Sequence, residues 1–421
     1  MNKFIGTAIG KSVLHLTRLR GSGGHALPGL IVERLLPNYL ANMLAQLPEG
    51  VVVITGTNGK TTTTKMVVEL LRFNGKRVLT NPTGSNFTRG IISSLTRQAR
   101  ITGRLPFDIG VFELDEAYAK HFVAQVKPRF VLALNVMRDQ LDRFGELDTA
   151  AKLIAQTLNE ATEGIIINDD DARLVKYAKQ SGKYTAYFGV SNKLRKHFPV
   201  DDEIVAVTKT TQKASTHQRI VELIDFSGQK VTFAISGHKH AVELKLTGQH
   251  NFQNAAAALA LAYTLLPQVS SKYLVQQLAS IDPAFGRGQK FTLKDGSQLE
   301  LILVKNPAGF RQVLASYPVA QKPTMFAVND NYADGRDTSW LWDVDFSALK
   351  GKSVPLTSGI RAADMALRLS YDNVKVKQVE PDLQAALKAF CNLRGDKLLI
   401  TTYTAMLKFY KMLIKQAGKK L

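Results

Sequence analysis

The sequence predicts an α/β protein with a larger, mostly parallel sheet in a central domain and a smaller sheet in a C-terminal α/β domain. Between about residues 50 and 170, apolar runs of strand length alternate with helical segments, which is typical of a parallel sheet covered on both faces. A second alternating unit runs from LELILVK at 299–305 to KLLITTY at 397–403. The chain of 421 residues is also too long for a single hydrophobic core.

The run VVVITGTNGKTTTT at residues 51–64 predicts a buried strand, a glycine turn and the start of a helix. In such a phosphate-binding loop, backbone N–H groups bind phosphate oxygens, a lysine reaches the terminal phosphates and a threonine hydroxyl ligates Mg²⁺. We therefore expect ATP and Mg²⁺ as cofactors, the alternative being an ordinary strand–turn–helix. The residues expected to bind the nucleotide here are Gly56, Thr57, Asn58, Gly59, Lys60, Thr61 and Thr62.

Shifts in composition divide the chain into three parts. We expect an N-terminal amphipathic helix and hinge at residues 1–38, a central ATP-binding domain at 39–285 and a C-terminal domain at 286–421. Within the central domain, short strand-like runs at 184–247 predict an antiparallel flap or small subdomain.

The first helix is expected to carry Ile5, Ile9, Val13 and Leu16 on one face, with basic residues elsewhere. Two interpretations remain open for this face. The helix either docks on its own domain or makes peripheral contact with an anionic membrane surface.

Composition excludes several classes of protein. The single cysteine, Cys391, cannot build a disulfide framework or a thiolate metal cluster, which fits a cytoplasmic protein. No apolar stretch approaches the ~18 residues of a membrane span, and no signal-peptide cleavage site follows the N-terminal segment. The net charge of +20 makes nucleic acid a default partner, but the basic residues are dispersed, so we expect none.

Acidic residues follow two predicted strands of the central domain. Glu113 and Asp115 end the strand DIGVFEL, and ligands of open α/β sheets bind beyond the carboxyl ends of strands. We expect Glu113 to hold Mg²⁺ together with Thr61; the alternative is a solvated loop acid. Asp139 and Asp142, in the run NVMRDQLD, follow the next strand and either lie near the metal or cap a helix.

The glycine spacing of the phosphate-binding loop departs from the common pattern, because Ile54 stands where that pattern has its first glycine. The shorter GTNGKT resembles the Mur ligase superfamily, whose members are ATP-dependent enzymes that join an amine to a carboxylate. The resemblance implies that GQHNFQN at 248–254 holds the adenine and that Arg287 meets the phosphates. Gln140 stands where these enzymes have a histidine near a second Mg²⁺, so it is a possible metal ligand. The implied adenine-binding residues are His250, Asn251 and Asn254.

Three further runs resemble the MurT family of that superfamily: KNPAGF at 305–310, NDNYADGRDTSWLWD at 329–343 and TYTAM at 402–406. This resemblance covers nearly the whole chain. It implies the ATP-dependent amidation of the D-glutamate α-carboxylate of lipid II to D-isoglutamine through an acyl phosphate, in peptidoglycan synthesis at the inner face of the cell membrane. It also implies a heterodimer with a GatD-type glutaminase subunit, which supplies ammonia.

The resemblance implies two catalytic residues in this chain. Lys60 would stabilise the transferred phosphate, and Asp337 would complete a Cys–His–Asp triad whose other members belong to the partner subunit. The alternative for Asp337 is a turn or helix cap, with Asp334 and Asp343 as neighbouring candidates.

One feature departs from the MurT pattern. Members often carry a four-cysteine zinc ribbon where residues 184–247 lie, and this segment contains no cysteine, so we expect no zinc. Charged residues such as Lys209, Lys213 and Arg219 are expected to hold the flap instead. A stand-alone amino-acid ligase of the muramyl-peptide or folylpolyglutamate type remains the main alternative, and a nucleic-acid-binding ATPase is a more distant one.

Overall fold

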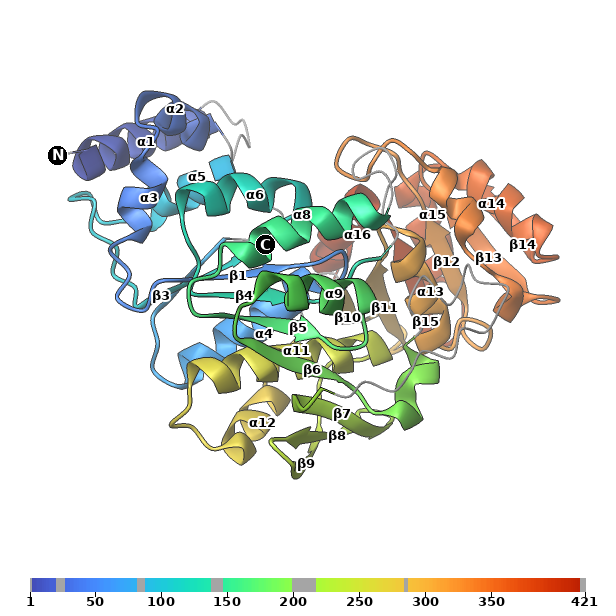
Figure 1. The fold of residues 1–421 in the computed structure, drawn as a ribbon. Coiled ribbons are helices and arrows are strands. Elements are labelled where there is room, and N and C mark those ends of the chain that lie inside the picture. Colours follow the sequence, from blue (N-terminus) through green and yellow to red (C-terminus); the bar gives the residue numbers. More distant parts are fainter. Residues whose placement is uncertain are drawn as a thin grey trace. The chain divides into compact units, whose positions relative to one another are not determined.

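The computed structural model describes residues 2–19, 27–81, 88–137, 147–198, 217–283 and 287–416. The chain forms two compact units, each with its own sheet (Figure 1). Unit 1 comprises Met1–Val136, Leu147–Lys245 and Asn251–Ile281, and unit 2 comprises Met137–Glu146, Leu246–His250 and Asp282–Leu421. The α/β fold class with two sheets is confirmed.

Unit 1 begins with a group of short helices: α1 (Asn2–Leu19), α2 (Leu27–Leu35), α3 (Tyr39–Leu44) and, later in the chain, α5 (Thr88–Gln98). Helix α1 packs on this group, and the Thr7 hydroxyl lies 2.8 Å from the buried Tyr39 hydroxyl. Gly10 allows a close approach, because a Cβ there would lie 2.4 Å from Thr96 Cγ2. The helix therefore docks on its own unit. Among the described residues, no helix combines the length and apolar character that a membrane crossing requires.

The sheet of unit 1 has the strand order β2-β3-β1-β4-β5-β6-β7-β8-β9. Neighbours from β2 to β7 are parallel, and the last two pairings are antiparallel. Apolar residues fill β1, β3, β4 and β5 because helices cover both faces of the sheet. The strands are β1 (Val51–Thr55), β2 (Val78–Thr80), β3 (Ile109–Glu113), β4 (Phe130–Ala133), β5 (Gly164–Asn168), β6 (Thr185–Val190), β7 (Arg219–Ser227), β8 (Lys230–Ile235) and β9 (His238–Glu243).

The helices of the central part are α4 (Lys60–Phe73), α6 (Glu116–Gln125), α8 (Leu147–Asn159), α9 (Ala172–Ser181), α11 (Gln249–Leu265) and α12 (Ser271–Ala279), with a 3-10 helix at Asn192–His197. The expected flap at 184–247 does not form a sheet of its own. Strand β6 lies within the parallel sheet, and β7, β8 and β9 extend it edge to edge, because β7 pairs in parallel with β6.

Unit 2 contains a second sheet with the strand order β10-β11-β15-β12-β13-β14, which is parallel except for the β10–β11 pair. Its strands are β10 (Arg287–Thr292), β11 (Gln298–Leu303), β12 (Thr324–Ala327), β13 (Ser353–Ser358), β14 (Lys375–Glu380) and β15 (Lys397–Thr401). Its helices are α13 (Pro307–Ser316), α14 (Ala362–Tyr371), α15 (Leu383–Cys391) and α16 (Tyr403–Gln416). Separate apolar clusters on the two faces hold the sheet, and Cys391 packs at the edge of one of them.

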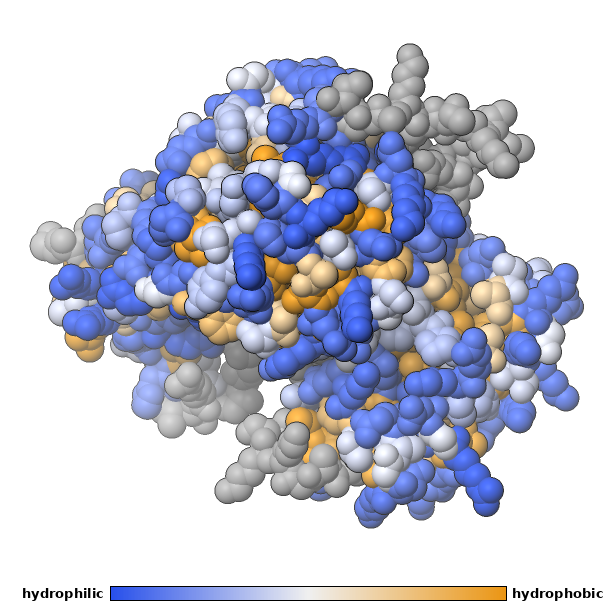
Figure 2. Space-filling model, turned by 90° about the horizontal axis from the view of Figure 1, so that it is seen from below, coloured by the Kyte–Doolittle hydropathy of each residue, from blue (hydrophilic) through white to orange (hydrophobic). Residues whose placement is uncertain are grey.

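One face of the molecule can be described by its hydropathy. Hydrophilic side chains cover most of the face shown in Figure 2, and apolar residues form patches between them. Exposed apolar groups on such a face need a separate explanation where they gather.

Candidate active site

The phosphate-binding loop lies where the sequence places it. Strand β1 ends at Thr55, and α4 begins at Lys60. Gly56 has φ of 129° and Gly59 has φ of 89°, backbone conformations that residues with a Cβ rarely adopt. Gly59 occupies the N-cap position of α4, so the first N–H groups of this helix lie at the loop. The loop therefore has the backbone geometry of an anion-binding helix N-terminus.

Asn135 holds this loop in place from the neighbouring strand segment. Its Oδ1 accepts a hydrogen bond of 2.9 Å from the Asn58 N–H, and its Nδ2 donates one of 3.0 Å to the Asn58 carbonyl. Its backbone carbonyl accepts a further bond from the Thr57 N–H. Asn135 opens the NVMRDQLD run, but sequence reasoning assigned it no role, because only the adjacency of β1 and β4 brings it to the loop.

Lys60 is 5% exposed, and its ammonium lies inside the loop. It donates to the Gly56 carbonyl and to the Thr57 carbonyl, the latter at 3.1 Å. It also forms an ion pair of 3.2 Å with Glu116, which is 1% exposed. Sequence reasoning missed Glu116, although it follows Glu113 in the same FELDE run. A buried cation at this position supplies the charge that a bound phosphate needs.

Thr61 and Glu113 are the two expected Mg²⁺ ligands, and the structure brings them together. The Thr61 hydroxyl donates a hydrogen bond of 2.9 Å to Glu113 Oε1. Asn81 orients Glu113, because its side-chain amide exchanges two hydrogen bonds with the Glu113 backbone, of 2.9 and 3.0 Å. Both donor atoms are oxygens, which suits Mg²⁺, an ion that takes few protein ligands and keeps water and phosphate oxygens.

The other acid that the sequence places beside this strand, Asp115, has a different task. It caps α6 and accepts a hydrogen bond from the Ala117 N–H. Within the described ranges, no group of three or more His, Cys, Asp or Glu side chains lies together as a metal cluster would require. The two-oxygen pair therefore fits a metal whose remaining ligands come from water and nucleotide.

The segment expected to bind adenine reaches the phosphate-binding loop through Asn254. A Cβ at Gly59 would be only 2.1 Å from Asn254 Oδ1, so the asparagine packs directly on the loop backbone. Asn254 donates a hydrogen bond of 3.4 Å to Asn251 Oδ1, and both side chains are buried. His250 is the second residue of α11 and belongs to unit 2 in the contact division. Of the three residues expected to bind adenine, Asn254 thus lies at the loop and Asn251 contacts Asn254.

Several expected residues fall outside what the structure describes. Gln140, Asp139 and Asp142 lie in the segment 138–146, outside the described residues. Arg287 begins β10, but its side chain is not described. The same holds for Lys209 and Lys213 in the segment 199–216. Their expected roles stay predictions.

The three runs that resemble the MurT family meet at one edge of the second sheet. KNPAGF follows β11, TYTAM follows β15 and NDNYADGRDTSWLWD follows β12, and these three parallel strands are neighbours. Buried Asn306 caps α13 by accepting a hydrogen bond of 2.8 Å from the Gly309 N–H. Polar residues of segments distant in the sequence therefore gather at the carboxyl ends of neighbouring strands, where open α/β sheets bind ligands.

Asp334 joins two of these runs. Its carboxylate accepts hydrogen bonds from the Thr404 N–H at 2.7 Å and from the Thr404 hydroxyl at 2.5 Å. It also accepts one of 3.1 Å from the Asn331 N–H within its own loop. Burial raises the pKa of Asp334 above its ordinary value. Asp334 is therefore a structural anchor of the loop that carries Asp337.

Asp337 lies three residues beyond this anchor and is partly exposed. Its Oδ1 accepts a hydrogen bond of 2.8 Å from the Ser339 N–H, at the start of the 3-10 helix Ser339–Asp343. The turn-cap alternative is therefore present in the structure. The bond to Ser339 uses only Oδ1 and Asp337 is partly exposed, so the cap does not exclude a role toward a partner. Asp343, the last residue of this 3-10 helix, is exposed.

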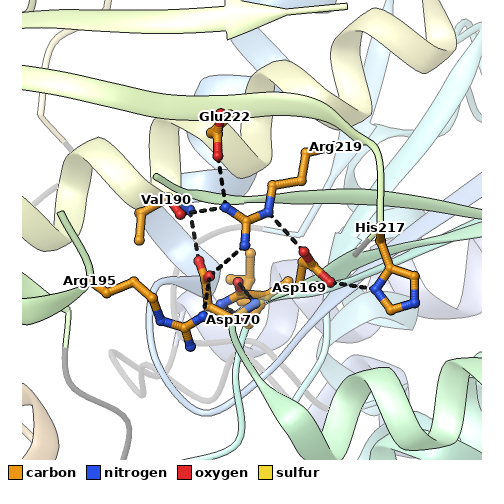
Figure 3. A network of polar contacts seen from close by, with 9 residues as sticks. Asp169, Asp170, Val190, Arg195, His217, Arg219 and Glu222 are labelled. Atoms are coloured by element: carbon orange, nitrogen blue, oxygen red, sulfur yellow. Dashed lines mark hydrogen bonds and ion pairs between the residues drawn. The ribbon is translucent and has the colours of Figure 1, made fainter. Parts of the chain in front are cut away.

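A buried charge network lies where the MurT pattern has its zinc ribbon (Figure 3). Arg219, at the start of β7, is bonded through Nε to Asp169 at 2.8 Å and through a terminal nitrogen to Asp170 at 3.0 Å. Its remaining nitrogen contacts Glu222 and the Val190 carbonyl. Both aspartates follow β5, so the network ties β7 to the parallel sheet, in agreement with the expected role of Arg219.

His217 adds a further contact to this network, with its Nδ1 2.8 Å from Asp169 Oδ1 and its ring stacked on Tyr187. Burial raises the pKa of Asp170, and the neighbouring Arg219 and Arg195 oppose that rise. The network links the segment after β5 to β7 through ion pairs and hydrogen bonds.

The doubly covered parallel sheet and the Lys60–Thr61–Glu113 arrangement define a nucleotide-binding protein of the Mur ligase type. Residues 54–262 match the family model of the Mur ligase middle domain, and residues 303–406 match the MurT ligase C-terminal model. A Streptococcus pneumoniae protein named lipid II isoglutaminyl synthase (glutamine-hydrolyzing) subunit MurT is 29% identical over 97% of this chain and 96% of its own. The Staphylococcus aureus protein of that name is 27% identical over 96% of each chain. The chain belongs to the MurT family of the Mur ligase superfamily, and it is a ligase.

Solved structures confirm the fold. A pseudomurein peptide ligase type C from Methanothermus fervidus superposes with a TM-score of 0.69 at 19% identity, covering 90% of this chain and 81% of that one. MurF from Thermotoga maritima in complex with ADP gives a TM-score of 0.67 at 17% identity, with 92% and 84% covered. The two-sheet architecture is thus that of Mur ligases.

Proposed function

We propose that the chain amidates the D-glutamate α-carboxylate of the lipid II stem peptide, forming D-isoglutamine for peptidoglycan. ATP would phosphorylate the carboxylate, and ammonia would displace phosphate from the resulting acyl phosphate, leaving an amide, ADP and phosphate. The observation that carries this proposal is the polar cluster of the three MurT-like runs, together with a complete phosphate-binding loop. We place the reaction in the cytoplasm, at the inner face of the cell membrane.

The residues of unit 1 fit the activation step. Lys60 and the N–H groups at the start of α4 would bind the terminal phosphates of ATP and neutralise the charge that develops during transfer. Thr61 and Glu113 would hold Mg²⁺, which screens phosphate charge when bound. Asn135 and Asn254 would keep the loop in the geometry that binds phosphate.

The second half of the proposal concerns the ammonia donor. The chain contains one cysteine, Cys391, which packs among apolar residues of unit 2, where burial raises its pKa. A thiol in such surroundings is a poor nucleophile. We propose that a GatD-type subunit supplies the nucleophilic cysteine and histidine, and that Asp337 fixes the tautomer of that histidine across the interface.

Co-expression with a GatD-type subunit tests the whole reaction. The complex should convert lipid II to its amidated form with ATP and glutamine, whereas the chain alone should do so only with ATP and free ammonium. Activity of the chain alone with a free amino acid in place of ammonia would favour the stand-alone ligase and contradict the proposal.

A test of Lys60 must distinguish a loss of stability from a loss of catalysis. Lys60→Met leaves buried Glu116 without its partner, and breaking a buried pair in this way destabilises a protein by about 3–5 kcal/mol. The double variant Lys60→Met/Glu116→Gln removes that unpaired charge. We expect it to recover much of the stability while amidation stays lost, and recovered amidation would remove Lys60 from the reaction.

Asp337 has a matched control in the same loop region. Asp345 makes the same local bond, with its Oδ1 2.8 Å from the Ser347 N–H. We expect Asp337→Ala to abolish glutamine hydrolysis by the complex while amidation with free ammonium persists, and Asp345→Ala to leave both intact. Normal glutamine hydrolysis in the Asp337→Ala complex would contradict the shared triad.

A further inference from the structure

Helix α1 is docked through one face only. Gly6, Thr7 and Gly10 are buried, and a Cβ at Gly6 would lie 2.4 Å from the Tyr39 ring. This face is fully used by contacts within unit 1. Docking within unit 1 therefore accounts for the buried face of α1, but it gives no role to the exposed face of the helix.

The opposite face of α1 is exposed and carries apolar residues together with Ser12 and His15. Phe4 is 53% exposed, Ile5 38% and Leu16 59%, and at 100° per residue these three project away from the docked face. On the neighbouring helix α2, Leu27 is 43% exposed and Leu35 is 59% exposed. Isolated exposed leucines need no explanation, but a group of them on two adjoining helices does.

A loop after α5 lies beside the start of α1. A Cβ at Gly103 would be 2.8 Å from the Lys3 carbonyl carbon, so the two segments touch. The same loop exposes Ile101, at 65%, between Arg100 and Arg104. The loop therefore brings the exposed Ile101 and two arginines next to the N-terminal end of α1.

The loop also borders a hollow of about 330 Å³ lined by arginines. Arg77, Arg100 and Arg104 contribute to its wall, together with Gln46. Arg77 is paired with Asp108. Within the part of the chain that the structure describes, the Arg100 and Arg104 side chains have no hydrogen-bond or ion-pair partner. Two unpaired guanidinium groups beside a hollow suit phosphate oxygens.

Basic residues outnumber acidic ones around this surface, where the nearby acids are Glu33 of α2, paired with Arg89, and Asp108, paired with Arg77. The sequence contains no Asp or Glu before Glu33, but four basic residues, Lys3, Lys11, Arg18 and Arg20. Residues 97–107 likewise contain three arginines and no acid. The chain as a whole carries 55 basic and 35 acidic residues, so these two stretches are more basic than the chain is on average.

We propose that the N-terminal docking surface, formed by the exposed face of α1, the exposed leucines of α2 and the loop 97–107, binds an anionic lipid bilayer. Phe4 and Leu16 enter the headgroup region, and Arg100 and Arg104 bind lipid phosphates. Apolar groups surrounded by cations are the composition of helices that lie on anionic membranes. This surface goes beyond the proposed function, and it stands on contacts that the reaction does not use.

Vesicle co-sedimentation of the full chain tests the proposal without ATP, lipid II or a partner subunit, so its outcome is independent of the amidation reaction. We expect binding to vesicles of phosphatidylglycerol and phosphatidylcholine in equal parts, and little binding to pure phosphatidylcholine. Arg100→Gln/Arg104→Gln should reduce the partition coefficient on the order of 30-fold. Leu16→Ser should reduce it roughly 10-fold.

Matched controls lie in unit 2. Lys375→Gln/Lys377→Gln removes two exposed cations of β14, and Leu367→Ser replaces a leucine that is 52% exposed. Both should bind vesicles like the wild type. If the control variants lose as much vesicle binding as the test variants, the binding depends on the general composition of the protein surface and the proposal is overturned. A concentration-dependent dimer that Leu16→Ser abolishes, without vesicle binding, would also overturn it and assign the surface to a second copy.

Discussion

The Thr61 hydroxyl donates a hydrogen bond of 2.9 Å to Glu113 Oε1, across 52 residues of sequence. Thr61 is the second residue of α4, and Glu113 ends β3, the strand beside β1. In a parallel sheet the carboxyl ends of neighbouring strands lie at the same edge, so the two side chains meet there. Their oxygens are the hard ligands that we propose for the Mg²⁺ of a Mg²⁺–nucleotide complex.

Removing the hydroxyl should weaken Mg²⁺-dependent nucleotide binding. For Thr61→Val, we expect ADP binding in the presence of Mg²⁺ to weaken by roughly 10-fold or more, since a contact to a charged group is lost. Thr61→Ser keeps the hydroxyl and should bind like the wild type. Calorimetric titration with Mg²⁺ and with a chelator checks this. Equal affinities for Thr61→Val and wild type under both conditions would remove Thr61 from the metal site.

Alanine substitutions at two glycines with similar φ can distinguish the cost of a left-handed backbone from the cost of a steric clash. Gly59 has φ of 89° with Asn254 Oδ1 2.1 Å from a Cβ, whereas Gly75 has φ of 80° and open space around it. Alanine at Gly75 should cost about 1 kcal/mol of unfolding free energy, the cost of the left-handed backbone alone. Gly59→Ala should cost more and should also impair nucleotide binding, with partial recovery in Gly59→Ala/Asn254→Gly. Denaturant titration and nucleotide binding measure the two effects, and equal costs for both glycines would contradict the crowding.

The Arg219 network should contribute to stability far more than a surface pair does. Arg219→Met leaves Asp169 and Asp170 buried without their partner, which should cost about 3–5 kcal/mol. Lys193→Met breaks an ion pair with Asp225 whose side chains are 73% and 57% exposed, so it should cost less than about 1 kcal/mol. Chemical denaturation of both variants checks the difference. Comparable small losses would show that the strand pairing of β7 suffices.

Asp171 should make stability depend on pH in an unusual direction. It caps α9 and accepts a hydrogen bond of 2.7 Å from the Val136 N–H, and burial raises its pKa to about 6. Because the folded-state pKa lies above the unfolded value, this residue stabilises the fold fully below about pH 4 and loses that contribution as pH rises through about 6. The stability of wild type relative to Asp171→Asn should therefore fall between these values, by up to about 3 kcal/mol.

Asp108 should make stability depend on pH in the opposite direction. The Arg77 guanidinium lowers the pKa of its carboxyl to about 2. Its contribution is present above the unfolded value near 4 and is lost as pH falls through about 2. Denaturant titrations of Asp108→Asn relative to wild type should therefore change below pH 4 and stay level between pH 4 and 6. A level difference for Asp171→Asn over that upper range would show that its carboxyl is ionised throughout.

Much of the nucleotide site could be predicted from local patterns. The strand–glycine–Lys-Thr–helix order at 51–64 and the acid at the end of β3 are short-range features, and both occur in the structure as expected. Asn81, Glu116 and Asn135 were missed because their contacts run between strands and helices that are distant in sequence. Residue type alone could have suggested Glu116, since it is the second glutamate of FELDE.

The region 184–247 shows where sequence reasoning stopped. Its strand pattern was recognised, but alternation of apolar residues does not reveal the neighbour with which a strand pairs. The parallel pairing of β7 with β6 made it an extension of the central sheet. Arg219 could then reach the two aspartates after β5 and take on the cross-linking task.

The sequence by itself determined the class of protein. The phosphate-binding loop and the three MurT-like runs are contiguous patterns, so they can be recognised in the sequence alone. Only the tertiary structure decided which residues act together. Strand order placed Thr61 beside Glu113 and Asp334 beside Thr404, since parallel neighbours present their carboxyl ends at one edge. It also separated the docked from the exposed face of α1, because burial depends on what packs against a helix and not on its periodicity.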